Sequence, residues 1–188
     1  ADADGSVLAD EVGAVVVTPE PVNGAGALLT WNYVDTDGWT DDVAFVADVL
    51  DDVEATTCID PERVLATGFA VGGVFASIVT CGLSDRIAVL ATVSGLYDPK
   101  GCAPDVAKPV LSFHGTGDRF IPFDGGIGEG PANLGLSPET TAGLTFMLER
   151  PGALASSAAW AKRAGCDAEP IEEATAEEGG PGVSLQVW

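Results

Sequence analysis

The fold of this chain is decided by the stretch Val64-Leu65-Ala66-Thr67-Gly68-Phe69-Ala70-Val71-Gly72-Gly73. Its first half continues an apolar run, and we expect a buried strand over residues 63–67. Gly68 then opens a sharp turn, and the small residues from about 71 to 81 predict a helix that begins at once. A strand that passes through a tight turn directly into a helix is typical of a βαβ unit.

Residues 68–72 have the spacing of a nucleophile elbow, G-x-S-x-G, with Gly68 and Gly72 at the two glycine positions. In such an elbow the central residue is strained and lies above the helix N-terminus, where backbone N–H groups can bind an oxyanion. The central residue is Ala70, which carries no nucleophile, so we do not expect this chain to form an acyl-enzyme. The alternative is an ordinary glycine-rich connection between a strand and a helix.

Strands and helices alternate along the rest of the chain. Apolar runs predict strands, buried on both faces in the central part of the chain, at residues 13–18, 87–94, 109–113 and 183–188. Apolar residues at helical spacing and small residues predict helices at 42–53 and 153–164. Loops are expected at residues 23–40 and at the Gly- and Pro-rich stretch 125–138, a surface insertion near a site. The sequence therefore predicts one α/β domain over residues 1–188, with a mostly parallel sheet flanked by helices.

Composition excludes several classes of function. The chain has 29 acidic and 8 basic residues and a net charge of −21, which disfavours binding to nucleic acids or anionic membrane surfaces. No apolar run is long enough to cross a bilayer, and the start at Ala1 lacks the basic and apolar parts of a signal peptide. No cofactor is expected. The excess of acid is also typical of proteins from salty habitats.

Four cysteines, Cys58, Cys81, Cys102 and Cys166, occur singly, so zinc-knuckle spacing is absent. They form either two disulfides in an exported protein or four buried thiols. The even count in an acidic, lysine-poor chain favours at least one disulfide and a secreted protein, extracellular or periplasmic. Three pairings remain open.

Several short sequence motifs lie before and after the elbow segment. They lie at 31–32 (Trp-Asn), 41–46, 58–63 (Cys-Ile-Asp-Pro-Glu-Arg), 83–86 (Leu-Ser-Asp-Arg), 102–104, 109–118, 121–126 and 160–166. Together they resemble the polyhydroxybutyrate depolymerase and feruloyl esterase group of α/β-hydrolases, across nearly the whole chain. The resemblance implies an α/β-hydrolase fold and a serine-type carboxylic-ester hydrolase.

The same resemblance implies roles for individual residues. Ala70 would occupy the nucleophile position, the backbone N–H of Val71 would be an oxyanion donor, and Asp118 would be the triad acid. Asp118 follows a buried strand, where open sheets place their sites, and the acid follows the nucleophile as the family order requires. The alternatives are an ordinary turn aspartate in Gly-Thr-Gly-Asp and an ordinary first helical turn at Val71. His114, the single histidine, precedes the acid and is not assigned as the base; we expect it to be hydrogen-bonded and partly buried.

The resemblance also implies what lies outside this segment. In the family, strands with a His-Gly loop precede the region of Gly13, and the catalytic histidine follows the last strand. The chain is therefore expected to be the central part of a domain, inactive as written, and prone to association through exposed strand edges. Its oligomeric state is not predicted.

The implied substrate is a polyester, a feruloylated or acetylated polysaccharide, or a small aryl ester. Trp31, Trp39 and Phe69 are candidate contacts for an acyl or sugar group, with packing as the alternative. A catalytically dead relative that acts as a ligand-binding or scaffold module is the competing function, and Ala70 supports it directly.

Residues 35–42 alternate carboxylates around Gly38, as the start of an EF-hand loop does, but the glutamate at the twelfth position is missing. Asp41 or Asp42 as a helix N-cap explains the same pattern without calcium. We therefore expect no metal site here.

Overall fold

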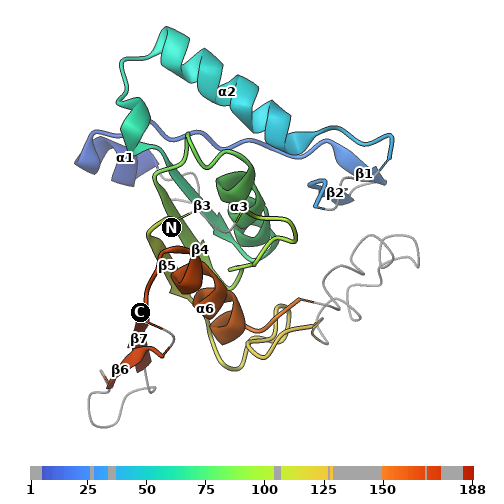
Figure 1. Ribbon diagram of the computed structural model, residues 1–188. Helices are drawn as coiled ribbons and strands as arrows, with labels where there is room; N and C mark the ends of the chain where they lie inside the picture. Colours follow the sequence, from blue (N-terminus) through green and yellow to red (C-terminus); the bar gives the residue numbers. More distant parts are fainter. Residues whose placement is uncertain are drawn as a thin grey trace. The chain divides into compact units, whose positions relative to one another are not determined.

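The computed structural model describes residues 6–25, 28–33, 37–103, 107–126, 128, 150–167, 169–174 and 184–188. These residues form two compact units, Ala1–Pro61 and Glu62–Trp188 (Figure 1). Within the described part of the chain, every helix is too short or too polar to cross a membrane.

The first unit consists of helices and one short hairpin. Its elements are α1 (Ser6–Val12), β1 (Asn23–Ala25), β2 (Leu28–Thr30) and α2 (Asp42–Thr56). β1 and β2 pair antiparallel, so the loop expected over residues 23–40 contains a hairpin at its start. The helix expected at 42–53 is confirmed as α2 and extends by a few residues.

The buried strand predicted at residues 13–18 is wrong. These residues are in no strand, and Val15, Val16 and Val17 are about half-exposed, at 51%, 49% and 47%. A β-strand satisfies its N–H and C=O groups only through a neighbouring strand. No described strand pairs with this segment, so its apolar character alone does not produce a strand.

The N-terminus of α2 explains the aspartates that precede it. Asp41 is the N-cap, with φ −74° and ψ 95°, and its Oδ1 accepts a hydrogen bond of 2.9 Å from the Ala44 N–H. The buried Asp42 carboxylate accepts from Asn23 Nδ2 at 3.0 Å and from the Asn32 N–H at 2.7 Å. The capping interpretation is therefore confirmed. Residues 34–36 lie outside the described chain, and the described residues contain no group of three potential metal ligands.

The second unit is built on a parallel sheet. Its elements are the short 3₁₀ helix η1 (Pro61–Arg63) at the boundary, β3 (Leu65–Phe69), α3 (Val71–Gly82), β4 (Val89–Val93), β5 (Val110–Phe113), α6 (Ala153–Arg163), β6 (Ile171–Ala174) and β7 (Ser184–Val187). The strands β3, β4 and β5 are parallel and adjacent in that order, whereas β6 and β7 form an antiparallel pair. The strands and helices expected in this unit are confirmed within a few residues. β6 is an element that the sequence did not predict.

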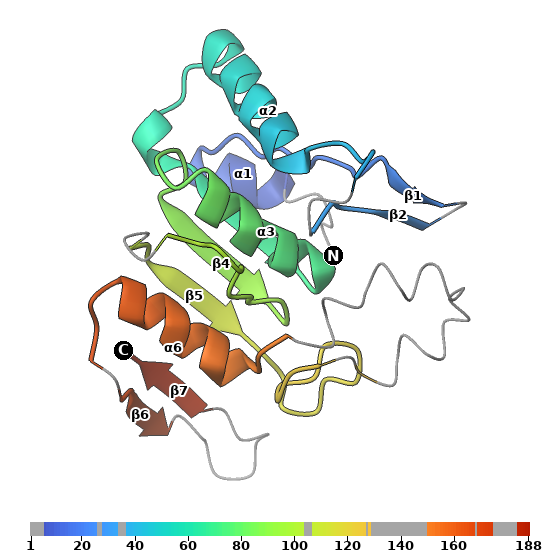
Figure 2. The ribbon, with the colours of Figure 1, turned by 45° about the vertical axis from the view of Figure 1, so that its right-hand side comes forward.

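One face of the β3–β4–β5 sheet is covered by helices. The register places Ala66, Leu90 and Val110 side by side, and these residues pack with Ala76 of α3 and Trp160 of α6. Figures 1 and 2 show α3 and α6 on the same side of the sheet. This arrangement of helices on a parallel sheet is compatible with an α/β fold.

The opposite face of the same sheet is exposed and apolar. Its large side chains are Leu65 (62% exposed), Phe69 (72%), Val93 (43%), Leu111 (52%) and Phe113 (60%). The prediction of strands buried on both faces is therefore wrong for the described residues. The side chains of both faces are apolar, but burial of the second face requires a second packed layer. The helices α3 and α6 both cover the face of Ala66, Leu90 and Val110.

A disulfide joins Cys81, near the end of α3, to Cys102, before β5. Cys58 and Cys166 are free and exposed. The expectation of at least one disulfide is confirmed, and the bond links α3, the helix that follows the elbow, to the segment between β4 and β5.

Candidate active site

The turn between β3 and α3 has an unusual backbone. Ala70, the single residue between the two elements, has φ 53° and ψ −124°. Positive φ is rare for a residue with a Cβ, because the side chain crowds the backbone. Hydrogen bonds hold it there: the Ala70 N–H donates to Val93 O at 2.9 Å, and Ala70 O accepts from the N–H groups of Gly73 and Val74 at 3.0 and 3.2 Å. This is the strained strand-to-helix geometry expected of a nucleophile elbow.

Glycines allow β3, α3 and the end of β4 to approach closely. A Cβ on Gly68 would overlap the carbonyl group of Gly72, and a Cβ on Gly95 would overlap Ala70 O. A Cβ on Gly73 would lie 3.0 Å from Gly95 Cα, closer than ordinary van der Waals contact, whereas a Cβ on Gly72 would meet nothing within 4 Å. The close approach therefore depends on Gly68, Gly73 and Gly95, and the second glycine of the G-x-S-x-G pattern is not required by space.

Val71 is the first residue of α3 and is 44% exposed. The first N–H groups of a helix have no partner within the helix, and they lie at the positive end of its dipole. The position of Val71 thus fits that of an oxyanion donor, a role that stays a prediction.

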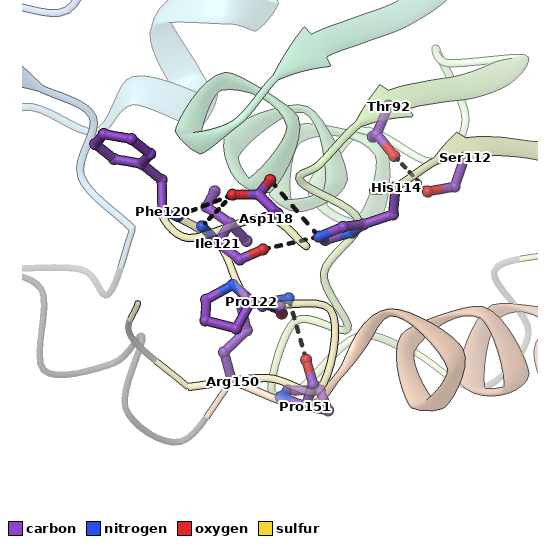
Figure 3. Close-up of polar contacts among 9 residues, drawn as sticks. All are labelled: Thr92, Ser112, His114, Asp118, Phe120, Ile121, Pro122, Arg150 and Pro151. Atoms are coloured by element: carbon purple, nitrogen blue, oxygen red, sulfur yellow. Dashed lines mark hydrogen bonds and ion pairs between the residues drawn. The ribbon is translucent and has the colours of Figure 1, made fainter. Parts of the chain in front are cut away.

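Asp118 lies in the loop after β5 and is held by several donors (Figure 3). Its Oδ1 accepts hydrogen bonds from the N–H groups of Phe120 at 2.8 Å and Ile121 at 3.0 Å. These contacts are those of a turn aspartate, and they also give the carboxylate a defined orientation.

The same contacts determine the charge of Asp118. Burial raises the pKa of this carboxyl, but hydrogen bonds from the Ile121 N–H, Ser94 and the Phe120 N–H, together with nearby His114, outweigh burial. The net result is a pKa of Asp118 below its ordinary value of 3.8. Asp118 is therefore ionised at neutral pH, which is the state that can stabilise an imidazolium.

The His114 side chain binds within the loop after β5 that carries Asp118, which we call the acid loop. Its Nε2 lies 2.8 Å from Ile121 O and 3.9 Å from Asp118 Oδ2, and its side chain is 4% exposed. Its ring also packs edge-on against Phe123, with centroids 5.6 Å apart. Because Nε2 faces a carbonyl oxygen, it carries the proton and donates it. The expectation of a hydrogen-bonded, partly buried histidine is confirmed.

Arg150 also holds the acid loop, and no sequence motif had singled it out. Its side chain is buried, and its guanidinium donates to the carbonyl oxygens of Pro122 and Pro151 (Figure 3). The Gly126 N–H donates to Arg150 O at 3.1 Å. Burial lowers the pKa of Arg150, and the negative charge of Asp118 partly offsets this effect. The loop after β5 is thereby attached to the segment that leads into α6.

The candidate aromatic contacts are divided between the two units. Phe69 is 72% exposed at the end of β3, next to Ala70, whereas Trp31 is buried in the first unit and Trp39 is half-buried there. Most of the insertion expected at 125–138 lies outside the described residues.

No model of a known protein family matches the chain. Feruloyl esterase B of Piromyces equi is 30% identical over 145 residues, which cover 74% of this chain and 25% of that protein. Feruloyl esterase C of Emericella nidulans is 30% identical over 116 residues, 61% of this chain and 39% of the relative. The bifunctional acetylxylan esterase/xylanase XynS20E of Neocallimastix patriciarum is 32% identical over 116 residues, 62% of this chain and 16% of the relative.

The chain is a homologue of esterases. It spans about a quarter to two-fifths of the length of the feruloyl esterases that it matches. The similarity thus covers most of this chain but only part of each relative.

Proposed function

We propose that this chain is the central part of a carboxylic-ester hydrolase of the serine-esterase type, with an α/β-hydrolase fold. The observation that carries the proposal is the backbone of Ala70, with φ 53° and ψ −124° between a parallel strand and a helix. The similarity to feruloyl and acetylxylan esterases supports the same reaction class.

Three positions of the candidate site, 70, 71 and 118, have roles in this reaction. A serine at position 70 would attack the ester carbonyl, and the Val71 N–H would stabilise the oxyanion. Asp118 would orient the histidine that moves the proton. His114 does not fit that role, because its Nε2 is bound to Ile121 O. Ala70 lacks the attacking oxygen, so the chain with alanine is inactive by this mechanism.

The names of the relatives suggest the class of substrate. We propose an ester of an aromatic or acetyl group on a polysaccharide, a polyester of the polyhydroxybutyrate kind, or a small aryl ester. Secretion agrees with the disulfide Cys81–Cys102, because such bonds persist in oxidising compartments.

Ala70 itself favours a second function. A turn that keeps the elbow backbone without the nucleophile can bind an ester and leave it intact. Under this alternative the protein is a ligand-binding or scaffold module.

The test is to place serine at position 70 in the protein as its gene encodes it, with whatever segments flank these residues. We expect Ala70→Ser to create hydrolysis of methyl ferulate or p-nitrophenyl acetate, with an acyl-enzyme visible by mass spectrometry. Adding Asp118→Asn to this serine variant should lower kcat by about 10⁴-fold, as loss of a triad acid does.

Two results separate the proposals. A serine variant no more active than the alanine protein contradicts the esterase. Binding of methyl ferulate by the alanine protein, measured by calorimetry, without any gain of hydrolysis in the serine variant would support the binding module.

A further inference from the structure

His114 is the single histidine of the chain, and its buried ring lies beside the proposed triad acid. Along β5 the exposed side chains of Leu111 and Phe113 alternate with half-buried ones, and His114 continues the half-buried set beyond the strand, with a side chain 4% exposed. The Phe113 carbonyl accepts from the N–H of Ser94, a residue with a positive φ of 57°, at 2.8 Å. The sheet therefore fixes the backbone from which the His114 ring projects.

The two nitrogens of the His114 ring have different surroundings. Nε2 lies 2.8 Å from Ile121 O, so it carries the proton and donates it to that carbonyl. Nδ1 is buried, and no described residue forms a hydrogen bond with it. A general base needs a lone pair within hydrogen-bond reach of the hydroxyl that it deprotonates. The geometry of His114 is instead that of a donor to the backbone of the acid loop.

The carbonyl that His114 binds belongs to a residue that itself binds Asp118 (Figure 3). The Ile121 N–H donates to Asp118 Oδ1 at 3.0 Å, whereas its carbonyl accepts from His114. His114 Nε2 is 3.9 Å from Asp118 Oδ2, which is too long for a hydrogen bond. His114 therefore acts on the carboxylate through the backbone of Ile121.

The far end of the acid loop is attached elsewhere. Arg150 donates to Pro122 O, and the Ala153 N–H donates to Phe123 O at 2.7 Å. The ring of Phe123 packs edge-on against His114. Different segments of the chain thus anchor the two ends of the loop, and the hydrogen bond from His114 lies beside the acid.

We propose that His114 is a positioning residue, whose Nε2–H holds Ile121 so that the Asp118 carboxylate keeps one orientation toward the catalytic histidine. This role uses His114 as a hydrogen-bond donor and requires no change in its protonation. It rests on the proposed function, because it takes Asp118 as the triad acid. Another N–H donor at position 114 should therefore keep the carboxylate in place, whereas an apolar side chain should not.

Two variants separate the donor of His114 from its ring. His114→Gln keeps an N–H donor at about the reach of Nε2, and His114→Phe keeps a ring against Phe123 but removes the donor. The first measurement is hydrogen exchange of the Phe120 and Ile121 amides by NMR, in the protein as its gene encodes it. We expect both amides to exchange about tenfold faster in His114→Phe, as loss of one hydrogen bond implies, and to change little in His114→Gln.

The matched control is Ser112→Ala. Ser112 lies on the same strand β5, and its hydroxyl takes part in a 3.1 Å hydrogen bond with Thr92 Oγ1 (Figure 3). This variant should leave both loop amides unchanged, and the buried Leu90 amide in β4 reports any loss of global stability. If His114→Phe fails to fold by circular dichroism, His114→Leu removes the same donor with a smaller side chain.

The catalytic measurement uses the Ala70→Ser protein. There His114→Phe should lower kcat about tenfold or more with KM unchanged, and His114→Gln should restore most of that loss. A His114→Gln variant as inactive as His114→Phe overturns the positioning role, because glutamine donates a hydrogen bond but cannot act as a base.

Unchanged exchange of the Phe120 and Ile121 amides in folded His114→Phe also overturns the positioning role, even if the Ala70→Ser protein hydrolyses esters. Faster exchange without any ester hydrolysis by the Ala70→Ser protein overturns the proposed function instead. The catalytic purpose of the contact then falls with it, while the hold of His114 on the acid loop is confirmed.

Discussion

On one face of the central sheet, Ala66, Leu90 and Val110 lie beneath α3 and α6. On the other face, Leu111 and Phe113 are more than half exposed, although they alternate with half-buried residues along the same strand. The two sets of side chains are equally apolar. The difference between the faces therefore comes from which layer packs on them, and apolar character alone does not decide it.

The covered face is also where the candidate site is anchored. Gly68 packs against Gly72 of α3, and Trp160 reaches the chain just after Ser94 through Tyr97 O. The core thus supports the two strained residues, Ala70 and Ser94, from one side of the sheet. We expect substitutions on this side to cost far more than substitutions on the exposed face.

The largest effect is expected for Trp160→Ala. Trp160 is 1% exposed, and its removal should lower the free energy of unfolding by about 3–5 kcal/mol, as truncation of a buried aromatic residue does. Leu111→Ala on the exposed face should cost less than about 1 kcal/mol. Urea denaturation followed by circular dichroism measures both. Equal losses would show that the second face is covered in solution.

A smaller effect is expected from one added methyl group at the elbow. Gly68→Ala places a Cβ against the Gly72 backbone and should cost about 1–3 kcal/mol, the range for overpacking. Gly72→Ala meets open space in a helix and should be neutral or stabilising by up to about 1 kcal/mol. Thermal unfolding of the two variants compares them. A destabilised Gly72→Ala would contradict the assignment of the close contact to Gly68.

The smallest effect on stability is expected on the exposed face. Leu111→Thr combined with Phe113→Thr should change the free energy of unfolding by less than about 1 kcal/mol, since threonine suits strands and these positions face solvent. The same variant should bind less of a hydrophobic dye and associate less in sedimentation velocity. Unaltered dye binding and association would mean that this face is not the exposed apolar surface of the protein in solution.

Local patterns predicted the elements that depend on near neighbours in the chain. The helices α2, α3 and α6 and the strands β3 to β5 follow from spacing, capping and the glycine turn. The prediction of a strand at 13–18 was wrong because a strand forms only where a second segment pairs with it, and the local pattern does not show the partner. β6 (Ile171–Ala174) was missed because a short strand with glutamates at its centre carries no apolar signal.

The candidate site divides in the same way. Ala70 and Asp118 were marked by local motifs. Ala70 lies between β3 and α3 with a positive φ, and the Asp118 carboxylate accepts from the Phe120 N–H, but their catalytic roles stay predictions. Gly95 and Arg150 were missed, because their contacts join residues that are far apart in sequence. The Ser-Gly pair at the end of the strand predicted at 87–94 was the one available signal for Gly95.

The positive φ at position 70 has a consequence for how such a protein evolves. The conformation is imposed by Val93, Gly73 and Val74 through backbone hydrogen bonds, so it does not depend on which small side chain stands there. Alanine and serine differ by one oxygen atom. A lineage can therefore lose or regain the nucleophile in a single mutational step, and both the alanine protein and the serine protein keep the same backbone at this turn.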